Sequence, residues 1–474
     1  MILSLISKII LKIMYTLISI FMLWLCNLLV SSFILSAEEN SLVGVHNLPD
    51  FYVFGINFDI SDDNIHIETV NTNDILEHGA TELRDITRYS INVDVPFDFG
   101  SSDPFVPYLG SGSNSINIRG IEGNRINIYI DGIPQTQSFI ANSWGNSNSG
   151  IGGTGRNFFD PAMYSSIQIN RSTENIETCP MGFAGAISFN IPDPNKILLD
   201  KTKAFSQKSS YVEVSKSISN QLQLVEKNGN YAYLSKISVV EGNERKNMAT
   251  ETKYAPNPSD YKSQAALFRI KYNENKSSIN ADYEYFHSNI VTDLNSAELD
   301  EVNSRHLSNI FVYLEEDKIR ETISLDYEKK SNLEFKSKVY FQNTKSNTLN
   351  IQRGGDDILT PEIEMRRDRE QNNFHETTSK GFSSTILSQK TFGAINLATK
   401  IGISLKEEDS LNSFLRKEYL TLSNEDSYFD FDEMQYVEVY SRINDPEPTN
   451  GIGYCPSKLY NKGLFLNFDL TFGE

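Results

Sequence analysis

Runs of alternating hydrophobic and polar residues have two different lengths along this chain. Between residues 71 and 200 the alternating runs are short, with expected strands at Ser90–Val95, Ser166–Asn170 and Ala186–Ile191 and short helical turns at 75–77 and 83–86. From about residue 209 the runs lengthen to roughly ten residues separated by polar turns, as in strands of membrane barrels. The pattern predicts a small α+β domain at 71–200 and a β-barrel portion at 201–474.

The longer runs pair into candidate hairpins. In the clearest case, Tyr211–Val225 and Tyr231–Val240 flank the turn residues Asn228-Gly229-Asn230. Further expected strands are Ala266–Tyr272 with Ile279–Phe286, Thr322–Tyr327 with Leu333–Phe341, then Ala394–Leu405 and Leu464–Phe472. Residues 356–373 and 409–448 are charged and irregular, which predicts external loops. This spacing gives about ten strands, against about 22 in plugged transporters, so an incomplete all-β transmembrane barrel is expected.

The stretch from residue 115 to residue 134 carries the most information. Ile126, Ile128 and Ile130 share one face of an expected strand, and Asp131-Gly132 follows as a turn. The charged members of the stretch are expected to neutralise one another in a partly dry interior: Arg119, Glu122, Arg125 and Asp131. The next stretch, Ser138–Arg156, is rich in Gly, Ser and Asn, which predicts an exposed loop.

The N-terminal region contains the one long apolar run in the sequence. Residues 13–35 are uncharged, follow Lys8 and Lys12, and precede Ser36-Ala37, a pattern that favours a signal peptide at 1–37 over a retained membrane anchor. Residues 38–70 are polar apart from Asp50–Phe54. This extended pentad can add to the edge of another protein's sheet, or can form the first strand of the following domain.

Composition excludes several classes of function. The net charge of −19 argues against nucleic acid as a partner, and the aromatic content of 11% suits a barrel. Beyond the signal segment, Cys179 and Cys455 are too far apart in sequence for a pairing to be argued, and neither has a metal-site spacing. Nucleophile triads and phosphate loops are missing as well. We therefore expect no catalytic residues, no bound metal and no permanent cofactor.

Three segments resemble the TonB-dependent outer-membrane receptor family, in its haemoglobin, haem and transferrin or lactoferrin branch. The segment 118–135 resembles the family's central plug signature, with Arg119, Gly120, Glu122, Gly123, Arg125, Asp131 and Gly132 as its structural residues. Phe189–Pro194 resembles the exit from the plug into the barrel, and Asp50, Phe51, Tyr52, Val53 and Phe54 resemble the TonB box. Residues 171–174 and 179–185 depart from the usual turns of that branch.

The resemblance implies an N-terminal plug domain inside the barrel lumen and active uptake of haem or iron from haem proteins across the outer membrane of a Gram-negative bacterium. Ligand would bind at the outer face, with Tyr108 as a candidate contact, and TonB with its inner-membrane energising complex would bind the box in 38–70. His287, His306 and His375 are expected to be surface residues. Expected partners are outer-membrane lipid and a haem protein, haem or an iron-siderophore.

Alternatives left open by the sequence are a ferric-siderophore receptor, a passive porin or adhesin barrel, and a secreted carbohydrate-active enzyme. The limited number of strands also leaves open a fragment, a frame-shifted gene or a pseudogene.

Overall fold

The computed structural model describes the chain in separate segments. They are residues 67–71, 87, 90–95, 116–121, 123–137, 139–141, 152–154, 156, 158–171, 185–244, 246, 256–293, 307–308, 311–331, 333–353, 356–357, 365–392, 395–422, 426–430, 435–439, 448–449 and 457–472. Predictions that fall outside them concern residues 1–37, 50–54, 75–77 and 83–86, and Tyr108, Glu122, Cys179, His306 and Cys455. Among the described residues, no helix is long and apolar enough to span a membrane.

The N-terminal part contains a five-stranded mixed sheet. Its order is β1-β8-β9-β4-β5, in which β4 and β9 are parallel and the other neighbours are antiparallel. The strands are β1 (Ile67–Asn71), β4 (Ile126–Ile130), β5 (Ile133–Pro134), β8 (Ser166–Asn170) and β9 (Gly185–Asn190). Their alternating Ile and Phe side chains are almost fully buried. The strands expected at 166–170 and 186–191 are confirmed, as is the shared face of Ile126, Ile128 and Ile130.

Smaller elements surround this sheet. Two short ladders join β2 (Val93–Asp94) to β3 (Asn117–Ile118) and β6 (Phe139–Ala141) to β7 (Gly152–Thr154). The helical turns are η2 (Gly123–Arg125), η3 (Pro161–Met163) and α4 (Pro194–Leu198).

Two expectations for this part need correction. The expected strand Ser90–Val95 is reduced to two paired residues, because Asn92 has a φ of 58°, which turns the backbone away from an extended path. The expected exposed loop 138–156 contains the β6–β7 ladder and ends on Arg156, which is buried.

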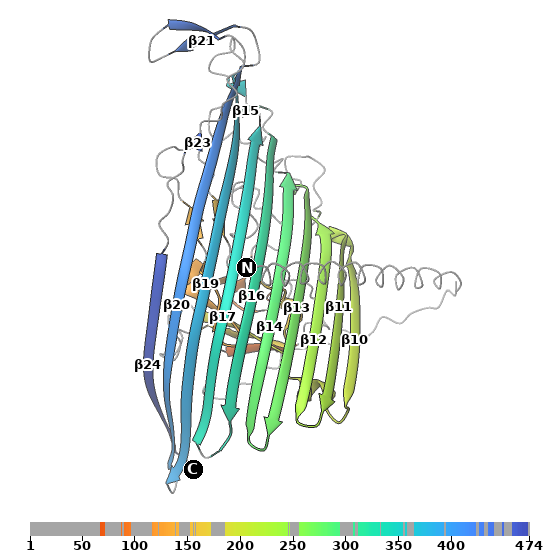
Figure 1. Ribbon diagram of the computed structural model, residues 1–474, viewed down its shortest axis with the longest axis vertical. Helices are drawn as coiled ribbons and strands as arrows, with labels where there is room; N and C mark the ends of the chain where they lie inside the picture. Colours follow the sequence, from red (N-terminus) through yellow and green to blue (C-terminus); the bar gives the residue numbers. More distant parts are fainter. Residues whose placement is uncertain are drawn as a thin grey trace, which may run out of the picture. The chain divides into compact units, whose positions relative to one another are not determined.

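The C-terminal part is one large antiparallel sheet of 13 strands (Figure 1). Ten of its strands are long and follow one another in space in sequence order: β10 (Lys203–Val212), β11 (Ser217–Asn228), β12 (Tyr231–Asn243), β13 (Ser259–Glu274), β14 (Ser277–Asp293), β16 (Phe311–Lys329), β17 (Leu333–Arg353), β19 (Met365–Phe392), β20 (Ile395–Leu422) and β24 (Ser457–Phe472). The short strands β15 (Leu307–Ser308), β18 (Asp356–Asp357) and β23 (Pro448–Thr449) pair at its margin. β21 (Asp426–Asp430) and β22 (Gln435–Val439) form a separate hairpin.

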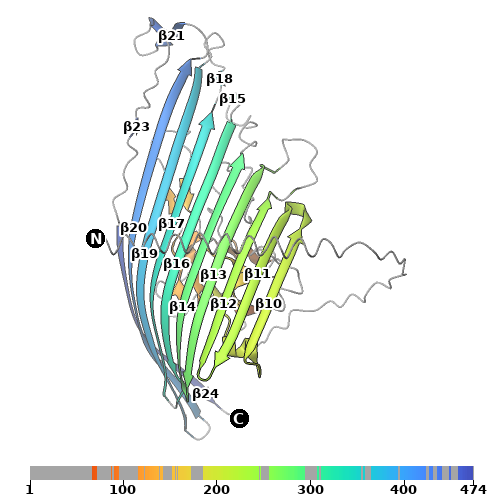
Figure 2. The ribbon, with the colours of Figure 1, turned by 45° about the vertical axis from the view of Figure 1, so that its right-hand side comes forward.

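The predicted number of about ten barrel strands is confirmed, although some boundaries are wrong. The run expected from Tyr211 to Val225 is split by η4 (Glu213–Ser215), and a further strand, β10, precedes it. The two expected external loops are partly strand, since β19 begins at Met365 and β20 continues to Leu422. Between the described parts of β10 and β24 no ladder is formed, so the sheet is curved but open (Figure 2).

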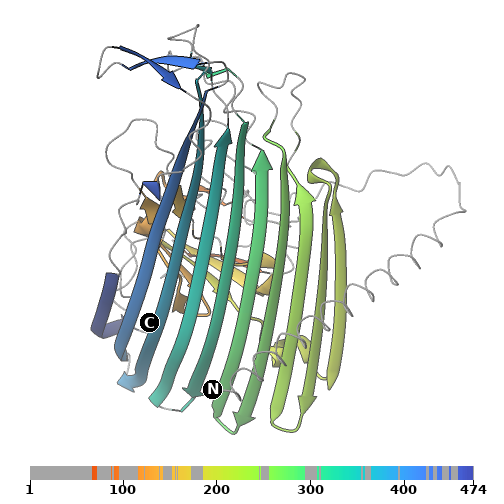
Figure 3. The same cartoon turned by 45° about the horizontal axis from the view of Figure 1, so that its top comes forward.

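Short turns lie at one end of the sheet and longer connections at the other. β11 and β12 are joined by Gly229-Asn230, where Gly229 has a φ of 57°, and β13 and β14 by Asn275-Lys276, where Asn275 has a φ of 50°. Positive φ at these positions suits the tight turns of antiparallel hairpins. Figure 3 shows the long strands running side by side between the two ends.

Side chains of the large sheet alternate between a polar inner face and a largely apolar outer face. On β14 the buried inner residues include Asp282 and Glu284, whereas Ile279 on the outer face is 39% exposed. Exposed Phe, Tyr, Ile and Leu residues on β10 to β20 continue this outer face.

An apolar cluster joins the two parts of the chain. It combines side chains from the N-terminal part with inward-facing ones from β11 to β14: Phe158, Phe159, Met163, Tyr164, Phe189 and Leu198 with Val225, Leu234, Ala265, Leu267 and Phe286. The N-terminal domain therefore packs against the inner face of the barrel wall.

Candidate functional site: the polar contacts between plug and wall

The centre of the site is the tight turn between β4 and β5. Asp131 and Gly132 both have positive φ, 48° and 80°, which is the conformation of a two-residue hairpin turn and is tolerated by Asp and Gly. The Asp131 backbone N–H donates to the Phe189 carbonyl at 2.7 Å, which ties the turn to β9. The turn therefore holds the Asp131 side chain in a fixed position.

Two cations of the barrel wall meet at one oxygen of Asp131. Arg269 on β13 donates from Nη2 to Asp131 Oδ2 at 2.7 Å, and Lys338 on β17 donates from Nζ to the same Oδ2 at 3.1 Å. Lys338 also donates to the Asp131 backbone carbonyl. The Arg269 side chain is 7% exposed and that of Asp131 is 20% exposed, so these ion pairs lie largely away from water.

Each of these cations also has a carboxylate partner within the wall. Arg269 donates to Asp282 on β14 at 2.6 and 2.8 Å, and Lys338 pairs with Asp326 on β16 at 3.2 Å. Burial alone would raise the pKa of Asp131, but the charges of Lys338 and Arg269 outweigh it and hold that pKa below its usual value.

Carboxylate oxygens of Asp131, Asp282 and Asp326 lie within 4.8 Å of one another, close enough to suggest a metal site. Arg269 and Lys338 already pair with them, so the arrangement is an ion-pair network.

A second contact lies at the exit from the plug. Asp193 Oδ1 accepts the Asn195 backbone N–H at 2.9 Å and so caps α4, while Oδ2 accepts from Lys271 Nζ at 2.6 Å. Burial would raise the pKa of Asp193, but the hydrogen bonds from Lys271 and Asn195 lower it overall. A single carboxylate thus fixes both the helix and its position against β13.

A third contact uses neutral groups from the plug. Arg320 on β16 pairs with Glu284 on β14 at 2.8 Å and also donates to Tyr164 Oη at 3.2 Å and to Gln135 Oε1 at 3.4 Å. Tyr164 donates in turn to Glu284 at 3.1 Å. The pair Arg320–Glu284 is complete within the wall, and the plug adds hydrogen bonds without adding charge.

Asp160 brings a buried carboxylate toward β10 and β12. Its Oδ1 accepts the Ala162 backbone N–H at 2.9 Å and caps η3. Burial raises the pKa of Asp160, and the nearby charges of Lys236 and Lys208 offset this only in part. This carboxylate is therefore held in its ionised form less favourably than Asp131.

Arg156 stabilises the signature segment from inside the plug. Its guanidinium donates to the backbone carbonyls of Gly123 at 3.1 Å, Thr136 at 3.3 Å and Ile126. Burial lowers the pKa of Arg156 to about 10, so it stays charged at neutral pH. Three carbonyls, one before β4, one at its first residue and one after β5, are thereby satisfied by one side chain.

The residues expected from sequence are only partly brought together. Arg119 and Arg125 are exposed, and Asp131 pairs with wall residues instead of with them, so the expected self-neutralising set is wrong for its described members. The signature glycines Gly120, Gly123 and Gly132 have positive φ values of 82°, 72° and 80°, which explains why glycine stands there.

The described histidines of the barrel differ. His287 lies on the outer face with its side chain 32% exposed, beside Asp317 at 2.8 Å, as expected of a surface residue. His375 is 7% exposed and bonds to Thr377 Oγ1 at 2.9 Å, so its expected surface position is wrong. It faces the lumen because inward and outward positions alternate along β19.

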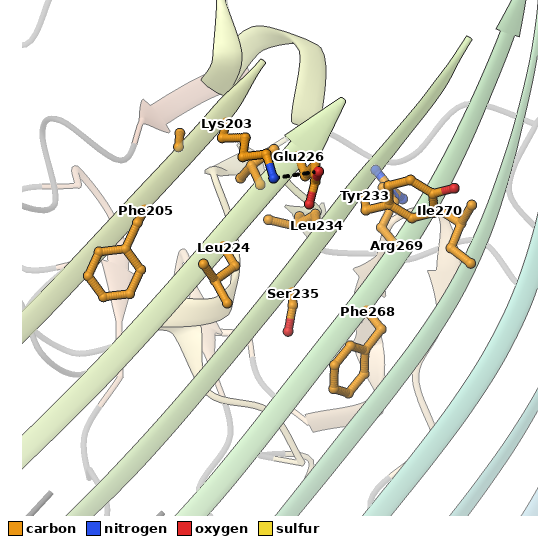
Figure 4. A pocket seen from close by; sticks show the side chains of 12 residues that line it. Lys203, Phe205, Leu224, Glu226, Tyr233, Leu234, Ser235, Phe268, Arg269 and Ile270 are labelled. Carbon is orange, nitrogen blue, oxygen red and sulfur yellow. Dashed lines mark ion pairs between the residues drawn. The ribbon is translucent and has the colours of Figure 1, made fainter. Parts of the chain in front are cut away.

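A hollow on the wall does not have the features of a ligand site. It is lined by residues of β10 to β13, among them Phe205, Leu224 and Phe268, which Figure 4 shows along neighbouring strands. Its Lys203–Glu226 ion pair, at 2.8 Å, has side chains that are 72% and 52% exposed. Of its polar lining residues only Arg269 belongs to the network at Asp131, so we place the functional site at the contacts between plug and wall.

Comparison with known proteins identifies the N-terminal domain. Residues 59–186 match the TonB-dependent Receptor Plug Domain. This segment of the chain is therefore similar to the plug domain of the TonB-dependent receptor family. Transferrin-binding protein A of Haemophilus influenzae is 28% identical over 158 residues, which are 32% of this chain and 16% of that protein. A hemoglobin and hemoglobin-haptoglobin-binding protein of Haemophilus ducreyi is 24% identical over 233 residues, covering 45% of this chain and 23% of that protein.

Solved receptor structures have the same fold. The FrpB iron transporter of Neisseria meningitidis superposes with a TM-score of 0.51 at 13% identity, covering 77% of this chain and 63% of that one. The FpvAI receptor in its pyocin S2 complex gives a TM-score of 0.52 at 13% identity, covering 86% and 51%. The relatives of this chain are transport receptors. Its plug match contains Asp131, Arg156 and Tyr164, whereas Asp193 lies beyond it.

Proposed function

We propose that this receptor takes up haem, or iron from haem proteins, across the outer membrane in a TonB-dependent manner. The observation that carries the proposal is a plug domain seated by ion pairs on the inner face of a barrel wall. The named relatives, which bind haemoglobin, haemoglobin-haptoglobin or transferrin, support a host iron source. The chain spans less than a quarter of the length of these relatives, at 16% and 23%.

The outer face of the wall supports a position in the membrane. Aromatic pairs such as Tyr231–Tyr272 and Tyr327–Phe335 lie near the end with the short turns, as the aromatic girdle of an outer-membrane barrel does near the periplasm. Outward Phe and Ile residues follow, and ion pairs such as Lys345–Glu376, at 3.0 Å, come farther along the strands. We therefore assign the short turns to the periplasm and the longer connections to the cell exterior.

The length of the strands supports a large ligand. β19 and β20 have 28 residues each, whereas about 9–11 residues cross a bilayer. At a tilt of about 45° and a rise of about 3.3 Å per residue, the remaining residues project on the order of 40 Å beyond the lipid. A wall of that height can hold loops that contact a protein such as haemoglobin.

Transport requires the plug to move, and the contacts described above define what must break. We assign residues 1–37 to the signal peptide, 38–70 to the periplasmic segment, 71–200 to the plug and 201–474 to the barrel portion. TonB would bind Asp50–Phe54, and Tyr108 would contact ligand. Pulling on the plug must then detach Asp131 from Arg269 and Lys338, because a ligand-driven switch requires contacts that differ between the two states.

Deletion of residues 50–54 tests the proposal. We expect cells that depend on haem to lose growth while they retain haemoglobin at their surface. Deletion of the five upstream residues 40–44 is the matched control and should leave both properties intact. Unchanged haem-dependent growth after deletion of 50–54 would refute the TonB-box assignment. Growth on ferric siderophores alone would point to a siderophore receptor, and solute passage independent of TonB would point to a porin.

A further inference from the structure

We propose that Arg269 and Lys338 form a binding station for one carboxylate of the passing cargo once Asp131 has withdrawn. The inference rests on the proposed uptake function, which places this wall beside the transport path. The cargo would be a small molecule with a free carboxylate, such as the propionate of a haem or the acid group of an iron chelate.

The geometry of the bound Asp131 defines the station. The guanidinium of Arg269 and the ammonium of Lys338 converge on the same oxygen, at 2.7 and 3.1 Å. Two charged donors directed at one oxygen favour an anionic acceptor over a neutral one, because charge-assisted hydrogen bonds are about twice as strong as neutral ones. Asp131 thus occupies the position that a cargo carboxylate would take.

The charges of the wall allow this exchange. Removing one member of a buried ion pair usually leaves its partner uncompensated, at a high free-energy cost. Here Arg269 keeps Asp282 and Lys338 keeps Asp326 when Asp131 leaves, so two cations remain with two carboxylates. An incoming carboxylate restores the resting arrangement of three carboxylates and two cations. Asp131 is therefore the exchangeable member of the network.

The position of the station is also defined. Arg269 lies five residues before the end of β13 at Glu274, and Lys338 lies five residues after the start of β17 at Leu333. Both residues are thus at the same level, close to the short turns that we assign to the periplasm. A carboxylate held there would be at the exit from the lumen.

The other contacts between plug and wall lack this arrangement. Arg320 pairs with Glu284 and takes only neutral partners from the plug, Tyr164 and Gln135. Lys271 offers a single ammonium to Asp193, which is at the same time the cap of α4. Among the described contacts of the plug, two wall cations converge on one plug carboxylate oxygen only at Asp131.

Chemical rescue of the whole chain of residues 1–474, purified in detergent, tests the proposal. In Asp131→Ala, hydrogen exchange of the β4 and β5 amides in detergent should accelerate at least about tenfold, the effect of losing a charged hydrogen bond. Propionate should slow it again in a saturable manner, whereas propionamide, which has the same shape without the charge, should not. Arg269→Gln combined with Asp131→Ala should abolish the response to propionate.

The native protein supplies a second measurement in case Asp131→Ala does not fold. Propionate should compete with Asp131 and accelerate exchange of the same amides, and propionamide should have no effect. Equal effects of the two compounds, or no effect of propionate on either protein, would overturn the station. Haem uptake enters none of these measurements, so failure of the proposed function and failure of the station remain distinguishable.

Discussion

Replacement of Arg269 by Met should loosen the plug more than any change of an exposed charge. The substitution keeps an unbranched side chain but removes the guanidinium that bonds to Asp131 at 2.7 Å and to Asp282 at 2.6 and 2.8 Å. The side chains of Arg269 and Asp282 are 7% and 2% exposed, so the carboxylates cannot turn to water. Breaking a buried pair in this way costs about 3–5 kcal/mol.

Hydrogen exchange of the β4 and β5 amides, with chemical denaturation of the purified protein, measures this cost. A loss of about 3 kcal/mol corresponds to more than a hundredfold faster exchange, because each 1.4 kcal/mol is about a factor of ten. Lys203→Met is the matched control: it breaks the exposed pair with Glu226, whose median worth is about 0–1 kcal/mol. Equal effects of the two substitutions would refute the reasoning.

A double substitution distinguishes the free energy lost with the ion pair from the cost of a buried carboxylate left without its cation. Adding Asp282→Asn to Arg269→Met removes one of the two abandoned carboxylates and should recover part of the stability. The same network predicts a dependence on pH. Because the pKa of Asp131 is lowered in the folded state, its contribution is present at neutral pH and is lost as the pH falls through that lowered pKa. The Arg269→Met variant should show less of this acid-induced loss.

Two further predictions concern other residues. Asp160→Asn should stabilise the protein at neutral pH, because burial raises the pKa of Asp160 and its ionised form is disfavoured in the fold; thermal melts should show the gain at pH 7 and its disappearance at acid pH, where Asp160 is protonated, and a loss at pH 7 would contradict the sign. Gly381→Ala should destabilise the barrel by about 1–3 kcal/mol, because a β-carbon there would overlap the ring of Tyr340; urea unfolding should show this cost in the native background but not beside Tyr340→Ala.

Local features of the sequence predicted the parts of the fold that depend on neighbours along the chain. The turn at Asp131-Gly132 follows from two residues that tolerate positive φ, and the structure has φ values of 48° and 80° there. The hairpin at Gly229 and the strand Ser166–Asn170 follow from alternation next to turn residues, and both are confirmed.

The partners of Asp131 could not be predicted in this way. Arg269 and Lys338 are 138 and 207 residues away from it in sequence. Alternation can place both cations on the inner face of their strands, but the register of three strand pairings, β13 with β14, β14 with β16 and β16 with β17, decides that they meet at one point. Nearby Arg119 and Arg125 looked like the natural partners and proved to be exposed.

The sequence pattern did not predict the ends of β19 and β20 that lie away from the short turns, for a different reason. Alternation between apolar and polar residues indicates a strand only where one of its faces lies in lipid or in a core. Along 365–373 and 409–422 charged residues occupy both sets of positions, as at Arg366-Arg367-Asp368, so the signal disappears although the ladder continues. Where strands extend beyond the lipid, their outer face is in contact with water, so apolar residues are no longer favoured on it.

The contacts of the plug explain how one domain can be held firmly and still be released. Apolar burial against β11 to β14 stabilises the docked position of the plug in proportion to the buried area. The apolar side chains have no alternative partner once this contact is broken. The polar contacts that Arg269, Lys338 and Arg320 make with the plug differ, since each of these three cations keeps a carboxylate of the wall when the plug leaves. Breaking one of these contacts then costs only the free energy of that contact, because the wall cation is not left without a carboxylate. A wall that neutralises itself is what allows Asp131 to act as a releasable contact.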